Sequence, residues 1–100
     1  GRIGATVHGF KNRYPSLYLY YIFKNLSKQE NVFLNYQVVQ SKKGILTFLL
    51  DSKLTSEVER KLITEIEKYF KKDINFQIKQ QANFIYTKGK LKNFISKINE

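Results

Sequence analysis

The feature that most constrains the fold is a strongly amphipathic segment, residues 54–72, which reads LTSEVERKLITEIEKYFKK. Its apolar residues recur three and four positions apart, which places them on one face of a helix. Ser56 followed by Glu59 predicts a capping box at the start of this helix. The glutamates of the segment, Glu65 included, lie among lysine partners, as in the pairs Glu57–Lys61 and Glu67–Lys71, and predict a solvated outer face. The predicted core stripe consists of Val58, Leu62, Ile66, Tyr69 and Phe70.

Runs typical of β-strands flank this helix. VFLNYQVVQ (32–40) and ILTFLLD (45–51) are joined by SKKG, in which Gly44 supplies the permissive backbone of a short hairpin. After the helix, DINFQIKQ (73–80) alternates apolar and polar residues, as a strand with one wet face does.

The two ends of the chain add further elements. Residues 3–8 alternate like a short strand, and Pro15 is well placed in the first turn of a helix over residues 15–26. Tyrosines cover most of that helix outside its core face, which suggests a partner surface. Residues 91–98 carry apolar side chains at helical spacing and predict a short terminal helix. The core face of the first helix consists of Leu19, Ile22, Phe23 and Leu26.

The predicted order is strand, helix, strand, strand, helix, strand and a short terminal helix. We therefore expect an α+β fold, the ferredoxin-like βαββαβ arrangement, with a small, mostly antiparallel sheet and helices on one face. One hundred residues allow one domain, residues 1–100, with one modest core.

Composition excludes several classes of protein. The chain has no cysteine and one histidine, His8, so it builds no disulfide framework and no zinc site. It has no apolar run long enough to cross a bilayer and no signal-peptide pattern, so we expect a cytoplasmic protein. It also has no methionine, which suggests a piece of a longer protein.

The net charge of +10 favours anionic partners, although it also serves solubility. Nucleic acid is disfavoured, because the strand GILTFLLD offers Phe48 alone where an RNA-recognition motif carries a basic start and paired aromatics. The chain has no Gly-x-Ser-x-Gly elbow and no Walker phosphate loop.

One stretch near the end of the chain stands out, YTKGKLKNF (86–94), with Lys88, Lys90 and Lys92 around Gly89. A glycine next to a lysine permits a backbone conformation that other residues resist. The lysine can then point away from the sheet and meet an anion as a compact charge.

Two motifs resemble the ends of the small C-terminal domain of adenylate-forming enzymes. They are GRIGATVHGFKNRYPS at the start and YTKGKLKNFISKI at the end. The resemblance is to phenylacetate–CoA ligases and their relatives in capsular-polysaccharide biosynthesis. In that family a Gly-Arg hinge precedes a strand, a glycine turn and a Pro-Ser helix start, and a Gly-Lys motif closes the domain. Here Gly4 and Ala5 stand where the family has hinge aspartates.

The resemblance implies a lid that acts with a large N-terminal adenylation domain and is inactive alone. That domain would bind ATP with Mg²⁺, a small carboxylic acid and CoA. Lys90 would contact the forming acyl-adenylate, while Arg2 and Gly4 would form the hinge on which the lid turns. Arg13 and Lys88 are expected contacts for phosphate or CoA.

Two other functions are compatible with the residues alone. A free-standing ferredoxin-like module would bind nucleic acid or a protein partner. A regulatory domain of the same topology would bind a small metabolite. The sequence does not specify which acid is activated or which acceptor receives the acyl group.

Overall fold

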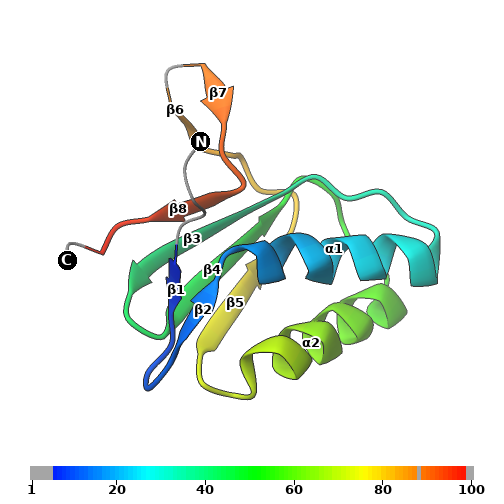
Figure 1. Ribbon diagram of the computed structural model, residues 1–100. Helices are drawn as coiled ribbons and strands as arrows, with labels where there is room; N and C mark the ends of the chain where they lie inside the picture. The colour runs from blue at the N-terminus through cyan, green and yellow to red at the C-terminus, as the bar shows by residue number, and fades with distance from the viewer. Residues whose placement is uncertain (1–5, 88, 99–100) are drawn as a thin grey trace.

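The structure is a computed structural model that describes residues 6–87 and 89–98. Its elements follow the chain as β1 (Thr6–His8), β2 (Arg13–Pro15), α1 (Leu17–Glu30), β3 (Tyr36–Lys42), β4 (Ile45–Leu50), α2 (Ser56–Phe70), β5 (Asn75–Lys79), β6 (Tyr86–Thr87), β7 (Lys90–Leu91) and β8 (Phe94–Ser96). Figure 1 shows both helices packed on one face of the sheet.

The main sheet has four strands in the order β5-β4-β3-β8. The β3–β4 hairpin is antiparallel and turns at Gly44, which has a positive φ of 81°. Strands β5 and β8 each lie parallel to their neighbours, β4 and β3. The expected α+β class with helices on one face is confirmed and is compatible with a small ferredoxin-like domain. The expectation of a mostly antiparallel sheet is wrong, because the sheet is mixed.

The hydrophobic core lies between the helices and the sheet face that they cover. The predicted core face of α1 is confirmed, since Leu19, Ile22, Phe23 and Leu26 are all buried. On α2 the predicted stripe is also buried, except that Tyr69 is only partly covered. The sheet contributes mainly Val38, Leu46, Phe48 and Leu50. Phe48 is fully buried and is therefore no platform for a stacked base.

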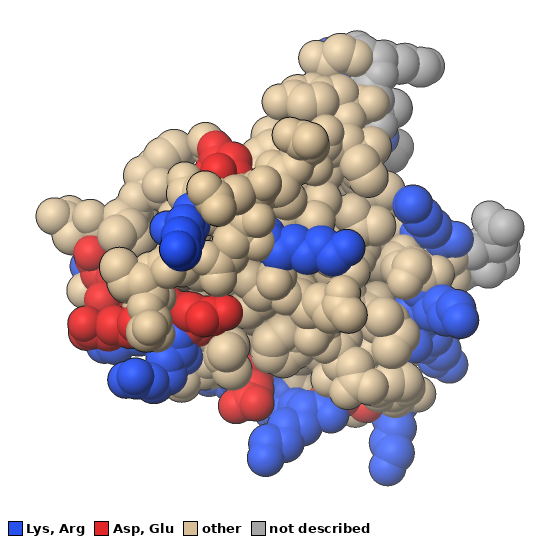
Figure 2. Space-filling view, turned by 180° about the vertical axis from the view of Figure 1, so that it is seen from behind, with Lys and Arg blue, Asp and Glu red and all other residues tan. Residues whose placement is uncertain are grey.

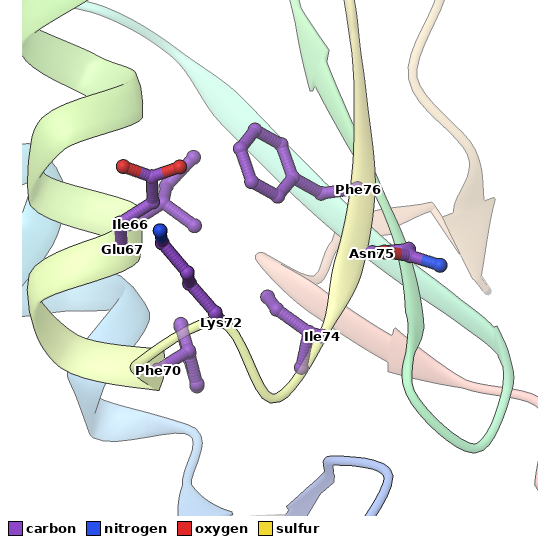
Figure 3. Close-up of a pocket in the computed structure, with 7 residues that line it drawn as sticks. All are labelled: Ile66, Glu67, Phe70, Lys72, Ile74, Asn75 and Phe76. Carbon is purple, nitrogen blue, oxygen red and sulfur yellow. The ribbon is translucent and has the colours of Figure 1, made fainter.

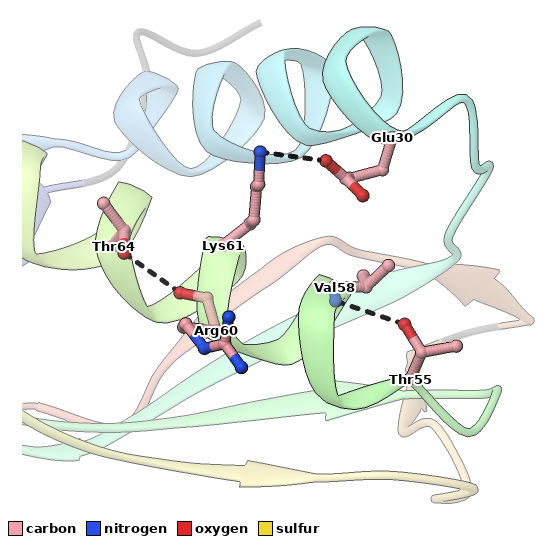
Figure 4. A network of polar contacts seen from close by, with 6 residues as sticks. All are labelled: Glu30, Thr55, Val58, Arg60, Lys61 and Thr64. Carbon is pink, nitrogen blue, oxygen red and sulfur yellow. Dashed lines mark hydrogen bonds and ion pairs between the residues drawn. The ribbon is translucent and has the colours of Figure 1, made fainter.

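Helix α2 begins one residue earlier than the capping box predicted. Its N-cap is Thr55, whose hydroxyl accepts a hydrogen bond from the Val58 N–H at 3.2 Å (Figure 4). The extended backbone of Thr55 directs its hydroxyl at the free N–H groups of the first turn. Lys61 forms an ion pair across the helix pair, with Glu30 of α1 at 3.2 Å.

The outer face predicted for α2 is not uniformly solvated. Glu65 is buried, and its carboxylate accepts a hydrogen bond from the Asn25 side chain of α1 at 3.3 Å. Asn25 also donates to the Tyr69 hydroxyl at 3.2 Å. A helix repeat alone does not show which polar residue the neighbouring helix will cover.

The terminal helix predicted over residues 91–98 is wrong, because Phe94–Ser96 forms strand β8. Phe94 lies beside Val38 and packs against the core, and Ile95 lies beside Val39. Backbone hydrogen bonds from Val38 N–H to Asn93 and from Lys97 N–H to Gln40 join the segment to β3. The open edge of β3 thus supplies hydrogen-bond partners for the extended backbone of this segment, and these partners outweigh the short helical pattern in its sequence.

The first strand also differs from the expectation. Within the described residues, β1 pairs with β2 rather than with the main sheet, and Pro15 ends β2 instead of opening a helix. Helix α1 extends from Leu17 to Glu30. No helix among residues 6–87 and 89–98 is both long and apolar enough to span a membrane.

Candidate functional site

Lys90 lies on a hairpin that projects beyond the end of the main sheet. The hairpin consists of β6 and β7, and it stands clear of the helices in Figure 1. Thr87 pairs with Lys90, so a two-residue connection joins the strands. Gly89 in this connection has a φ of 77°, which favours glycine. Lys90 is exposed, and β-alternation directs it away from the hairpin face of Leu91.

A single buried side chain holds the base of this hairpin. Gln37 of β3 is fully buried, and its Nε2 donates to the carbonyl oxygens of Ile85 at 2.7 Å and Lys92 at 2.9 Å. Its Oε1 accepts from the Ile85 N–H at 2.8 Å. Because Ile85 precedes β6 and Lys92 follows β7, the side-chain amide of Gln37 joins the chain on both sides of the hairpin to the sheet.

A second buried glutamine holds the other end of the chain. Gln40 accepts from the His8 N–H at 2.9 Å, and it donates to the carbonyl oxygens of His8 at 2.7 Å and Lys42 at 3.0 Å. Strand β1 is therefore fastened to β3 through a side chain rather than through a strand ladder. Sequence reasoning missed Gln37 and Gln40; two glutamines inside the apolar run NYQVVQ were the available signal.

Arg13 and Lys90 are not brought together. Arg13 is exposed at the start of β2, beside the turn of the first hairpin. Figure 1 places that turn at the end of the molecule opposite the β6–β7 hairpin. The other predicted site residues, Arg2, Gly4 and Lys88, lie outside the described residues.

The turn beside Arg13 is organised by Asp73. Its carboxylate accepts hydrogen bonds from the N–H groups of Lys11 at 3.0 Å and Asn12 at 2.9 Å, and from the Tyr14 hydroxyl at 3.1 Å. A Cβ on Gly9 would collide with this carboxylate and with the Tyr14 ring, so any larger residue there would force these side chains to shift. Burial raises the pKa of Asp73, but the hydrogen bonds from Asn12, Lys11 and Tyr14 outweigh it and hold the pKa below its ordinary value.

This arrangement predicts an acid-sensitive turn. A carboxyl whose pKa is lowered by folding adds stability above its unfolded pKa of about 3.9, and that stability is lost as the pH falls through the folded value. We expect Asp73→Asn to be less stable than the wild type at neutral pH and to lose less stability on acidification. Thermal melts between neutral and acid pH measure both effects. Parallel melting curves across that range would contradict this role.

A separate cleft lies between α2 and the start of β5, away from the projecting hairpin. Its volume is about 400 Å³. Figure 3 shows the side chains of Glu67 and Lys72 near each other at its mouth, with Phe76 on the strand side. The buried side chains of Ile66 and Phe70 form the floor. The cleft contains opposite charges and contributes nothing to the surroundings of Lys90.

On the side of the molecule that is hidden from the viewer in Figure 1, the basic residues are dispersed. Figure 2 shows lysine and arginine side chains both at the margins of this face and within it, with uncharged residues between many of them and acidic residues beside others. They form no continuous basic track here, as a nucleic-acid backbone would require. Among the described residues, no three His, Cys, Asp or Glu side chains are grouped as ligands for a metal ion.

The most distinctive arrangement is thus a lysine on an exposed hairpin, positioned by a buried glutamine. Because the hairpin extends past the sheet, the ammonium group of this lysine can reach an anionic pocket on a neighbouring domain or protein. No family model, curated protein or solved structure matches this chain.

Proposed function

We propose that this chain is the C-terminal mobile domain of an adenylate-forming enzyme similar to phenylacetate–CoA ligases. The observation that carries the proposal is the exposed position of Lys90 on a projecting hairpin whose base is held by Gln37. In the proposed enzyme, Lys90 enters the active site of the adenylation domain. Its ammonium group offsets the negative charge that develops between the substrate carboxylate and the α-phosphate.

The reaction would join a carboxylic acid to the α-phosphorus of ATP and release pyrophosphate. The acyl group would then pass from the adenylate to the thiol of CoA, with AMP as the leaving group. The adenylation domain would hold ATP with Mg²⁺, the acid and CoA, and the enzyme would act in the cytoplasm. This chain would contribute the positioned lysine and the exclusion of water on closure.

The separation of Arg13 from Lys90 agrees with a two-step cycle. The two residues lie on hairpins at opposite ends of the molecule (Figure 1). A rotation about a hinge preceding β1 would withdraw Lys90 after the first step and bring the turn beside Arg13 toward the acceptor. Domain rotation of this kind lets one active site perform two reactions in turn.

Exchange of pyrophosphate into ATP tests the proposal. The polypeptide that joins this chain to its adenylation domain should catalyse the exchange only when a suitable carboxylic acid is present. A panel of aryl and alkyl acids would identify the substrate class. Failure of every acid, combined with salt-sensitive binding of single-stranded RNA by the chain alone, would favour the nucleic-acid module instead.

A further inference from the structure

An exposed groove lined by aromatic rings lies between the second half of α1 and the start of β3, and none of the functions above uses it. We call it the aromatic groove, and its volume is about 340 Å³. The lining residues that matter here are Tyr20, Phe23, Lys24, Lys28, Phe33 and Tyr36. They come from one helix, the loop that follows it and the next strand.

A stacked aromatic pair forms the floor of the groove, and exposed aromatic rings stand at its rim. Phe23 and Tyr36 stack with their ring centres 4.0 Å apart and their planes 6° from parallel. At the rim, Phe33 is 82% exposed and Tyr20 is 49% exposed. An almost bare phenylalanine beside a stacked pair is unfavourable in water, and burying it against a partner would be favourable.

The charge around the groove is positive. Lys24 lies over the Tyr20 ring at 5.8 Å, and Lys28 follows one helical turn later. The neighbouring acid on α1, Glu30, already forms its ion pair with Lys61 of α2. The groove therefore combines an apolar pocket with lysines at its edge, which complements an apolar side chain flanked by carboxylates.

Other occupants fit less well. Single-stranded nucleic acid needs a continuous basic track beside the rings that its bases stack on, but the cations lining the groove are Lys24 and Lys28 alone. A second copy of this chain would bring a net charge of +10 against another +10. Nucleic acid offers phosphates in place of carboxylates, and a second copy carries 18 Lys and Arg against 8 Asp and Glu.

We propose that the aromatic groove binds a short acidic segment of a partner protein, with an aromatic or long aliphatic side chain inserted beside Phe33. The phenyl group of Phe33 would close over the inserted side chain, while Lys24 and Lys28 pair with flanking carboxylates. This interaction does not depend on adenylation chemistry, so either proposal can fail while the other holds.

Binding of a fluorescein-labelled peptide to the 100-residue chain tests this inference. The probe is a short peptide in which phenylalanine and leucine are flanked by aspartates and glutamates. We expect saturable binding that weakens with salt and is lost when the probe's phenylalanine and leucine are replaced by serine. Phe33→Ser should weaken binding roughly tenfold, because truncation of a central aromatic anchor typically has at least that effect. Lys24→Gln with Lys28→Gln should also weaken binding and flatten its salt dependence.

Leu17→Ser is the matched control, since Leu17 is also an exposed apolar side chain, but it lies at the start of α1 and does not line the groove. It should leave peptide binding unchanged. The inference is overturned by three results: no saturable peptide binding, equal effects of Phe33→Ser and Leu17→Ser, or Phe33-dependent binding of oligouridylate in place of the peptide. Concentration-dependent dimerisation that requires Phe33, measured by sedimentation velocity, would assign the groove to a second copy and also overturn it.

Discussion

If the proposed function holds, replacing Lys90 with alanine should slow formation of the acyl-adenylate by about a hundredfold to a thousandfold in a polypeptide that joins this chain to its proposed adenylation domain. The substitution removes the ammonium group that, in the proposed enzyme, would meet the developing charge only when the domain is closed. Lys90 is exposed on β7, so its loss should not disturb folding. Single-turnover measurement of pyrophosphate release checks the rate directly.

The second half-reaction provides the internal control. Thiol transfer from a pre-made adenylate should change little in Lys90→Ala, because the proposed cycle withdraws the hairpin at that stage. Lys92→Ala removes the same charge from an exposed position directly after β7 and should slow adenylation only slightly. Equal losses in both half-reactions, or equal losses from the two lysines, would refute the role given to Lys90.

Replacing Gln37 with leucine should release the hairpin that carries Lys90. The side chain makes three hydrogen bonds to the backbone of Ile85 and Lys92, and leucine makes none. We expect a loss of about 2 kcal/mol of stability in total, which is less than three fully buried groups without partners would cost, because Ile85 is partly exposed and its backbone can rehydrate. Amide hydrogen exchange in β6 and β7 should accelerate more than exchange in α2.

Gln77→Leu is the matched control for this change. Gln77 is an exposed residue of β5, so the same substitution there should change stability by less than about 0.5 kcal/mol. In the proposed enzyme, Gln37→Leu should also slow adenylation, although Lys90 itself is not substituted. A variant with wild-type exchange in the hairpin would show that Gln37 does not position it.

Much of the architecture could be predicted from the residues of individual segments. Helix α2 and the buried faces of both helices follow from apolar residues three and four positions apart, since that spacing matches the helical repeat. The β3–β4 hairpin follows from two strand-like runs around Gly44, and the alternation of β5 follows from its sequence. Each of these patterns is determined by local backbone geometry.

Other features depend on what lies beside a segment. Residues 91–98 have helical spacing, yet Phe94–Ser96 pairs with the open edge of β3. Thr55 rather than Ser56 caps α2, because the extended backbone at Thr55 directs its hydroxyl at the helix. Glu65 is buried because Asn25 of the other helix faces it.

For the candidate site, the Gly-Lys turn and its surplus of positive charge could be predicted from the residues alone, because glycine's backbone freedom and lysine's charge belong to single residues. The projection of this turn from the sheet, the attachment of the two end hairpins to β3 by Gln37 and Gln40, and the distance of Arg13 from Lys90 all depend on the tertiary structure. These relations join residues that are distant along the chain, and their energies depend on which backbone groups are left without partners when the sheet and helices have packed.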